Sequence, residues 1–479
     1  MKYLTGRIVI YYFLVLLVAP FSLACKGSHD TQQEVAPPNT VIVSQKGGGQ
    51  YKTIGAALTA IKPGMRIIVR PGVYRESLVL NKSVEIVADL RGSAEGVTIQ
   101  TLNASSISMQ TDRATVHGIS IRHRVGLIGL LVNLFAKNKT PAVDVSQGEL
   151  MLQNCDIVSN AGAGIAIHGP AASPVIRNTK IHDSDSGVWF YDGAQGSLED
   201  CEIYSTHMAG VRIEDGANPI LRRCKIGRTE NAGIVVTDGG MARIEDCEIF
   251  ANAYSGLESR RGSKPIVLRT KIHHSKQNGV YVQQSSSAII EECQVYSNGG
   301  VGLQIIEHSS PLVTRSRIFD NVYSDVSISG GSDPTIKDCT IYGGEMSGLF
   351  VYNGGLGTIE NCDIFGHTKY QEVAIRGGNP IVRSCKIHKG KMGGVLFVDN
   401  AGGTLENCEI YENGATGVWI RTGSNPTIRN TKINHNEGVA VLAENNTAGA
   451  IIDCNLTGNT GGPWNIQSGS QLKRNGNTE

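Results

Sequence analysis

The sequence carries almost no net charge, since 44 lysines and arginines face 43 aspartates and glutamates in 479 residues. This balance gives no support to nucleic acid or an anionic membrane surface as the main partner. Proline is scarce, with 15 residues, whereas glycine is abundant, with 58. From residue 155 onward, apolar residues do not recur at helical spacing, which argues against an α-helical repeat.

The sequence also lacks the cysteine patterns of metal sites and disulfide scaffolds. Metal sites use closely spaced cysteine pairs, and disulfide scaffolds use irregular small loops. Here ten of the eleven cysteines share one repeating spacing of about 23 residues, or a multiple of it. This spacing predicts a column of small, buried thiols, with no metal and no cofactor. Cross-linking between neighbours such as Cys201 and Cys224 stays open.

The N-terminus has the composition of an export signal. Basic residues precede an apolar run at 8–18, and the small residues Ser22 and Ala24 follow at the positions that a signal peptidase reads. Residues 1–24 are therefore predicted to be a signal peptide, with residues 25–40 as a polar tether. Export would place the protein in the periplasm, at the cell surface or outside the cell.

Cys25 directly follows this predicted cleavage site. The arrangement resembles a bacterial lipobox, in which the cysteine is lipidated and becomes the mature N-terminus, but the usual leucine is displaced by one position to Leu23. Lipidation at Cys25 and plain secretion both remain open. A lipid anchor at Cys25 is the only membrane attachment that the sequence suggests.

One pattern recurs along the chain from Cys155: an apolar residue, three mostly polar positions, a charged residue and then isoleucine. After two slightly unequal steps, every step has the same length of about 23 residues. Such a register over fourteen units predicts a solenoid, because one unit cannot bury a core alone. The anchoring position is occupied by Cys155, Thr179, Cys201, Cys224, Cys247, Thr270, Cys293, Ser316, Cys339, Cys362, Cys385, Cys408, Thr431 and Cys454.

Each unit contains three short apolar runs separated by Gly, Asn, Asp and Ser. One contains the β-branched residue two positions after the anchor, a second follows a glycine, as at 187–190, and the third precedes the anchor, as at 174–176. Three short strands per coil bury their inner faces only when the next coil stacks on them. The predicted fold class is all-β, a right-handed parallel β-helix with coils of about 23 residues. Fourteen such coils would span roughly 65 Å along the solenoid axis, at ~4.8 Å each.

Charge alternates in sign from coil to coil at two positions. Arg177, Glu199, Arg222 and Glu245 lie two residues before successive anchors, and the residue after the anchor alternates in the same way, beginning with Lys180. Opposite charges would then pair at each step of a parallel stack. We interpret the alternation as a register lock and not as a ligand site.

Rings recur three residues after the anchor. A histidine there could be read as catalytic, but rings in one column predict a structural stack. The column contains His182, Tyr204, Phe250, His273, Tyr296, Phe319, Tyr342, Phe365, His388 and Tyr411.

The chain ahead of the repeats resembles a cap. Apolar residues at helical spacing over 53–61 predict a short helix that shields the edge of the first coil. Strand-like runs follow at 66–69 and 79–86, and an apolar stretch at 125–135 suits a buried or interfacial segment. The predicted organisation is a cap with first coils at 41–150, repeats at 151–460 and a C-terminal tail at 461–479.

The outward residues that follow the turn glycine of each coil form the candidate binding strip. Strand alternation points Trp189 and Tyr191 outward. Aromatic rings stack on the apolar faces of sugars and arginine clamps uronate carboxylates, although aromatic residues are also ordinary strand formers. The predicted ligand-binding residues are Trp189, Tyr191, Arg212, Tyr281, Phe350, Tyr352, Trp419 and Arg421.

Two segments carry a resemblance to known families. The alternation of 403–410 (GTLENCEI) with 425–433 (NPTIRNTKI) resembles the β-helix of F-box-only ubiquitin-ligase subunits and of bacterial carbohydrate-binding, sugar-hydrolase and alginate-epimerase proteins. Residues 49–76 are similar to the opening of pectin methylesterases. The resemblance implies a pectin-lyase-like β-helix over about 41–460.

The departures from these families concern function. An F-box and a zinc finger are missing, as are the paired catalytic aspartates of pectin methylesterases in their motif and the Asp-Pro-His-Asp signature of alginate epimerases. The resemblance therefore implies the fold and not an activity.

Two function classes remain. The first is an exported, non-catalytic protein that binds a polysaccharide or a cell-envelope protein along the strip. The second is a lyase, hydrolase or epimerase of uronic-acid polymers, in which Glu258, Arg260, Arg212 and Glu214 would supply acid, base and carboxylate-neutralising groups. Convergence of those carboxylates in a cleft with shifted pKa values would favour the enzyme.

Overall fold

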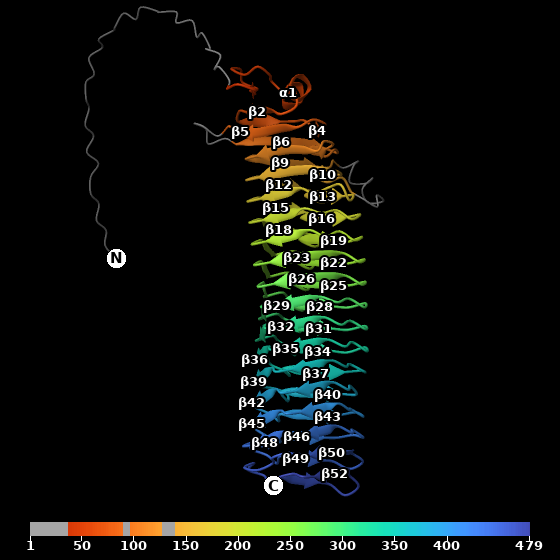
Figure 1. The fold of residues 1–479 in the computed structure, drawn as a ribbon. Helices are drawn as coiled ribbons and strands as arrows, with labels where there is room; N and C mark the ends of the chain where they lie inside the picture. Colours follow the sequence, from red (N-terminus) through yellow and green to blue (C-terminus); the bar gives the residue numbers. More distant parts are fainter. Residues whose placement is uncertain (1–36, 90–95, 127–138) are drawn as a thin grey trace, which may run out of the picture.

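The computed structural model describes residues 37–89, 96–126 and 139–479. Short parallel strands stack into a long solenoid with a short helix near the N-terminal end (Figure 1). The predicted fold class is confirmed. The predicted signal peptide, Cys25, most of the tether and most of the apolar stretch 125–135 lie outside the described residues.

Most coils contribute one strand to each of three parallel sheets, which we call A, B and C. In one coil, β14 (Val175–Arg177) belongs to sheet A, β15 (Lys180–Ser184) to sheet B and β16 (Val188–Tyr191) to sheet C. Ile181 of β15 pairs with Ile157 of β12 (Asp156–Ser159) and Ile203 of β18 (Glu202–Thr206). These isoleucines are fully buried, so the β-branched column is the interior of the solenoid.

The cysteine column lies inside the solenoid beside this core. The ten described cysteines are buried, as predicted, and none of them forms a disulfide in this structure. Each thiol donates to a backbone carbonyl, as Cys201 does to the Glu199 oxygen at 3.3 Å. Burial raises the pKa of Cys155 to about 11 and that of Cys293 to about 12, so these thiols stay protonated and unreactive.

The alternating charges of sheet A pair between adjacent coils. Arg177 Nε lies 2.9 Å from Glu199 Oε2, and Arg222 Nε lies 2.8 Å from Glu245 Oε2. Near the other end, Arg429 lies 2.9 Å from Glu406. The predicted register lock is confirmed, because a slip of one coil would bring like charges together.

The rings of the sheet B column stack on one another in two runs, from His182 to Tyr204 and from Phe250 to Tyr411. His182 and Tyr204 have ring centroids 4.8 Å apart, and Phe319 and Tyr342 lie 4.9 Å apart and 2° from parallel. Where Gly227 interrupts the column, the Arg228 guanidinium lies 5.5 Å from the Tyr204 ring and 5.8 Å from the Phe250 ring. The structural interpretation of these histidines and aromatics is confirmed.

The predicted capping helix is α1 (Ile54–Ala60). The Thr53 hydroxyl accepts from the Ala56 N–H, and the Glu76 carboxylate accepts from the N–H groups of Ile54 and Gly55 at 2.9 and 2.7 Å. These acceptors satisfy the free donors of the first turn. Ile54, Ala57 and Leu58 are buried over the first coil.

Two strand assignments near the cap have different outcomes. The run at 66–69 forms β2 (Met65–Val69) of sheet A. The run at 79–86 is wrong as one strand, because it divides into β4 (Leu78–Leu80) of sheet C and β5 (Val84–Ala88) of sheet A. Both strands bury alternate residues in the same core, so the apolar pattern continues across the corner at 81–83 and conceals it.

The C-terminal residues 461–479 add further strands to the solenoid. Here β51 (Trp464–Ile466) pairs with β49 (Val441–Ala443), and β52 (Gln471–Asn475) pairs with β50 (Ala448–Ile452). The segment that we assigned to a tail therefore carries strands in register with the repeats. In the described part of the chain, no helix has both the length and the apolar character needed to cross a membrane.

Candidate functional site

The outward residues of sheet C follow one side of the solenoid, which we call the sheet C flank, and most of them are partly exposed, whereas Val235, Ser327, Ala374 and Leu396 are buried. Its strands are β16, β19 (Val211–Ile213), β22 (Ile234–Val236), β25 (Leu257–Ser259), β28 (Val280–Val282), β31 (Leu303–Ile305), β34 (Val326–Ile328), β37 (Leu349–Tyr352), β40 (Val373–Arg376), β43 (Val395–Val398), β46 (Val418–Ile420) and β49. The register stacks these outward residues in the order Trp189, Arg212, Val235, Glu258, Tyr281, Gln304, Ser327, Phe350, Ala374, Leu396, Trp419 and Leu442.

Trp189 is held in a fixed orientation at one end of the flank. Its Nε1 donates to Glu214 Oε1 at 2.8 Å, and its ring stacks on Tyr191 with centroids 4.2 Å apart. Arg212 pairs with Glu214 at 2.6 Å and lies 5.0 Å from the Trp189 ring. Glu214 is only 5% exposed, so it acts as the anchor of this cluster. The structure thus brings four of the predicted site residues together.

Trp419 is held in the same way near the other end. Its Nε1 donates to Glu444 Oε1 at 3.1 Å. Arg421 lies 3.0 Å from that carboxylate and 4.4 Å from the Trp419 ring. Sequence reasoning missed Glu444. The signal was present, since a glutamate follows each of the two tryptophans at the same separation, 25 residues along the chain.

The remaining predicted catalytic candidates, Glu258 and Arg260, lie three rungs from Trp189. Glu258 lies 3.5 Å from Arg260, and its burial raises its pKa, while the Arg260 charge opposes that rise. Val235 separates the rung of Arg212 from the rung of Glu258. Glu214 and Glu258 therefore each pair with the arginine of their own coil and do not form one dyad. In the described residues, no group of three His, Cys, Asp or Glu side chains is placed to hold a metal ion.

The loops between sheets B and C border the flank with exposed methionines and tyrosines. We call these residues the Met/Tyr rim: Met208, Tyr254, Tyr323, Tyr370 and Met392. Ala209, next to Met208, packs with the outward Val235 in a small apolar cluster, which places the loops against the sheet. Sequence reasoning missed the rim, although four of its members lie seven residues after an anchor.

A pocket of about 260 Å³ opens where this rim meets Phe350. Its floor is Ala374, a small residue between the outward side chains of Phe350 and Leu396. Tyr370 of the rim and Arg376 also line it. Of the predicted site residues, Phe350 lines the pocket, and its ring stacks on Tyr352 with centroids 4.7 Å apart.

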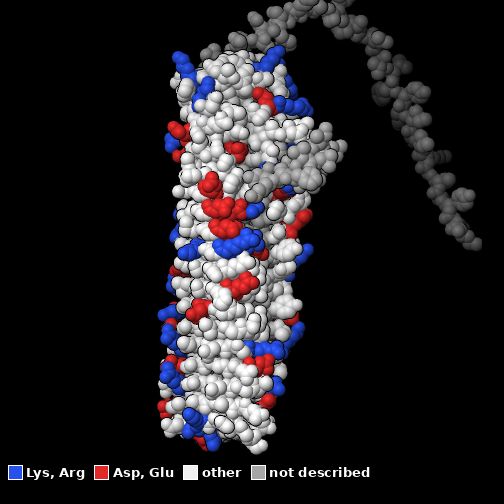
Figure 2. Space-filling model, turned by 90° about the vertical axis from the view of Figure 1, so that its right-hand side faces the viewer, with Lys and Arg blue, Asp and Glu red and all other residues white. Residues whose placement is uncertain are grey.

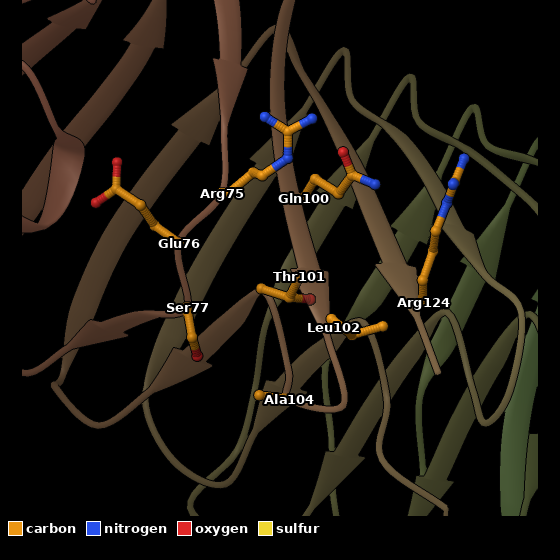
Figure 3. Close-up of a pocket in the computed structure, with 8 residues that line it drawn as sticks. All are labelled: Arg75, Glu76, Ser77, Gln100, Thr101, Leu102, Ala104 and Arg124. Atoms are coloured by element: carbon orange, nitrogen blue, oxygen red, sulfur yellow. The ribbon is translucent and has the colours of Figure 1, made fainter. Parts of the chain in front are cut away.

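A second pocket, of about 480 Å³, lies away from the flank on the first coils. Figure 3 shows Arg75, Gln100 and Arg124 extending toward the same side of the sheet. Gln100 and Arg124 come from β6 (Val97–Leu102) and β9 (Ile119–Arg124) of sheet B. Glu76 also lines this pocket, but its carboxylate is engaged by the N-terminus of α1.

Charged side chains are unevenly distributed on the face drawn in Figure 2. In the half nearer the N-terminus, acidic side chains adjoin basic ones, and broad uncharged stretches separate the remaining charges (Figure 2). Charges of both signs are therefore interspersed on this face.

Solved structures that are similar to this chain are distant in sequence. XylC in complex with xylose is 11% identical, covering 64% of this chain and 76% of XylC, with a TM-score of 0.42. Pectin methylesterase from carrot is 15% identical, covering 56% and 84%, with a TM-score of 0.36. The A-module of the mannuronan C-5 epimerase AlgE6 from Azotobacter vinelandii is 13% identical, covering 88% and 92%, with a TM-score of 0.30.

No curated protein matches the sequence. The family model described as the right-handed β-helix region matches at residues 107–252, 227–332 and 324–478, which together exceed half of the chain. With the stacked parallel coils of the structure, this match shows that the chain belongs to the right-handed β-helix family.

Proposed function

We propose that this protein is exported and binds a linear polysaccharide along the sheet C flank without chemically changing it. The observation that carries the proposal is the pair of fixed tryptophans. Trp189 and Trp419 are each oriented by a glutamate that accepts from the indole N–H and by an arginine over the ring. Aromatic rings that are already ordered lose little entropy when a ligand stacks on them.

The separation of the two clusters favours a long ligand. Ten rungs separate Trp189 from Trp419 in the sheet C register. At ~4.8 Å per rung this is roughly 48 Å along the solenoid axis. A polymer lying parallel to the axis can contact both clusters, whereas a single small molecule cannot.

The arrangement of carboxylates favours binding over catalysis. Hydrolysis of a glycosidic bond uses two carboxyl groups that flank that bond. Both oxygens of Glu214 are engaged, one by Trp189 and the other by Arg212. Glu258 lies two rungs away, at roughly 10 Å, and pairs with its own arginine. The raised pKa of Glu258 is the observation that keeps a polysaccharide-active enzyme as the alternative.

The export part of the proposal rests on sequence. Residues 1–24 have the pattern of a signal peptide, and Cys25 follows directly. Mass spectrometry of the mature protein tests both outcomes. A diacylated N-terminal cysteine shows lipid anchoring, an unmodified N-terminus at residue 25 shows plain secretion, and retention of residues 1–24 overturns export.

The decisive experiment measures binding and turnover on the same samples. Retardation in gels containing pectate, alginate, glucuronan or a neutral glycan gives the affinity. Trp189→Ala and Trp419→Ala should each weaken retention severalfold because each removes an ordered aromatic ring from the flank. Tyr411→Ala is the matched control, since Tyr411 stacks in the sheet B ring column. New reducing or unsaturated ends that disappear in Glu258→Gln would establish the enzyme, and no retention on any glycan would overturn the proposal.

A further inference from the structure

One coil of the flank has a longer loop than its neighbours. Eleven positions separate Cys362 from Val373, the first residue of β40, whereas ten separate Cys339 from Leu349 and Cys385 from Val395. Cys362 and Cys385 are still 23 residues apart, so the solenoid keeps its register. The extra residue lies in the loop that connects β39 (Asp363–Phe365) to β40.

Three fully buried ionisable side chains fix this loop. His367 Nε2 lies 2.9 Å from Asp325 Oδ2, and His367 Nδ1 is hydrogen-bonded to Glu372. The same glutamate accepts from the His367 backbone N–H at 2.8 Å, and Asn321 Nδ2 donates to Asp325 at 2.7 Å. Asp325, His367 and Glu372 are each 0% exposed.

The neighbouring coils leave room for these three side chains. A Cβ on Gly390 would lie 2.5 Å from Glu372 Oε1, and a Cβ on Gly348 would lie 2.7 Å from His367 Cε1. Both would clash, so the sequence provides glycine where the buried cluster needs space. Because both ring nitrogens of His367 are occupied by carboxylates, the cluster cannot transfer a proton to a ligand and acts by positioning the loop.

The fixed loop forms one wall of the pocket beside Phe350. Tyr370, which lies between His367 and Glu372 in the sequence, is exposed on the flank and lines the pocket. Ala374 leaves the floor open, and Arg376 lies at its edge with 64% of its side chain exposed. Arg376 Nε pairs with Asp399 Oδ2 at 2.6 Å, which holds the guanidinium near the opening.

From this geometry we propose that the pocket binds one uronic-acid ring of an acidic glycan. The apolar ring face contacts Phe350 and Tyr370, and the ring carboxylate pairs with Arg376. The volume of about 260 Å³ lies below the ~300–1,000 Å³ of typical small-molecule pockets, which restricts the occupant to about one ring. This inference rests on the proposed function and adds the class of sugar and the pocket that recognises it.

Asp399 gives the proposal a consequence that can be tested by gain of affinity. In the free protein the Arg376 guanidinium is paired with Asp399, so an incoming carboxylate competes with it. Asp399→Asn should therefore tighten binding of an acidic glycan severalfold. Arg376→Gln should weaken it about tenfold to a hundredfold, the range for a hydrogen bond to a charged group.

The experiment is calorimetric titration with oligogalacturonate and oligomannuronate, each compared with its fully methyl-esterified form. Esterification removes the negative charge and keeps the ring. Arg376→Gln should lower affinity for the acid and leave affinity for the ester unchanged. Ala374→Leu, which fills the floor, should weaken binding of both forms. Arg383→Gln is the matched control, because Arg383 also pairs with one carboxylate but lies on sheet A.

The failures of the two proposals are distinguishable. If glycan binding falls in Trp189→Ala and Trp419→Ala but is unchanged in Arg376→Gln or Ala374→Leu, the pocket assignment is overturned and the proposed function stands. If the wild-type protein binds no glycan in either charge form, both are overturned. Tighter binding of a tyrosine- and glutamate-rich peptide than of any uronate would assign the pocket to a protein partner and overturn the sugar assignment. A thermal melt of each variant confirms that it is folded.

Discussion

Sheets A and B differ from sheet C in what their outward residues contact. On sheet A, Arg177, Glu199, Arg222 and Glu245 pair with residues of adjacent coils. On sheet B, rings such as Phe319 and Tyr342 stack in the same way. On sheet C, the outward residues follow no such order, and Val235, Ser327 and Ala374 interrupt any row of charge or rings. Two faces therefore hold the register, and the third is free to vary.

The comparison also explains why the irregular features gather on one side. A change on sheet A or B interrupts a row of similar contacts that runs from coil to coil, whereas the contacts between coils on sheet C, such as that of Trp189 with Glu214, are confined to particular pairs of coils. The tryptophan clusters, the Met/Tyr rim and the one-residue insertion all lie at or beside sheet C. Such irregular features on a rigid scaffold suit the ligand recognition that we propose for this flank.

The largest expected effect comes from the interior that all three sheets share. Ile249 is 0% exposed, and Ile249→Lys should cost ~1.5–3 kcal/mol of burial plus several kcal/mol for an unpaired buried charge. Chemical denaturation followed by circular dichroism should show early unfolding. Tyr281→Ala, an outward change on sheet C, is the control and should shift stability by about 1 kcal/mol or less. Equal midpoints for wild type and Ile249→Lys would show that this column is not interior.

The next effect concerns the buried cluster at the edge of sheet C. Glu372→Gln removes one carboxylate from the buried His367 and should destabilise the protein by about 3–5 kcal/mol. Lys369→Gln, in the same loop, is the control because its partner Glu345 is exposed. A variant as stable as the wild type would contradict the assigned role of the cluster.

The same cluster makes stability depend on pH. Burial lowers the pKa of His367, but the two carboxylates outweigh it and hold the pKa at about 9, while burial raises the pKa of Asp325 to about 6. Both values exceed those of the unfolded chain, so the folded state binds more protons and stability falls as pH rises. The fall due to His367 should lie between about pH 6.5 and 9, as measured by melting temperature. This fall in melting temperature with pH should be smaller in Glu372→Gln than in the wild type. The same dependence on pH in both proteins would contradict the role assigned to His367.

Features that recur in nearly every coil could be predicted from the sequence, whereas most contacts that belong to particular coils could not. The anchor column, the charge alternation and the ring stack follow from a fixed period, because side chains one period apart must lie above one another. The Met/Tyr rim recurs in several coils but lies in loops, and Glu444 and the buried cluster of Asp325, His367 and Glu372 depend on contacts between particular coils. Their contacts depend on loop paths that no period specifies. In the sequence, Glu372 looks like an ordinary polar loop residue. Only the one-residue insertion before it distinguishes this loop from those of the neighbouring coils.

A smaller effect is expected on sheet B, where Arg228 replaces a missing ring. Arg228→Ala removes two cation–π contacts, with Tyr204 and Phe250, and should cost about 0.5–1 kcal/mol. Lys225→Ala, three residues earlier on the same surface, is the control and should cost less. Equal losses of unfolding free energy in Arg228→Ala and Lys225→Ala, measured by urea denaturation, would show that the guanidinium does not bridge the gap in the ring stack.

The smallest effect is expected in the sheet A charge ladder. Arg429 pairs with Glu406, and both side chains are partly exposed, so Arg429→Glu should cost only about 0.2–1 kcal/mol. The double reversal Arg429→Glu with Glu406→Arg should recover part of that loss, because the pair is restored with its order inverted. The recovery should shrink in 1 M salt, where the Debye length is about 3 Å. Additive single effects at low salt would mean that the ladder does not hold the register, and the distinction drawn between sheet A and sheet C would lose its physical basis.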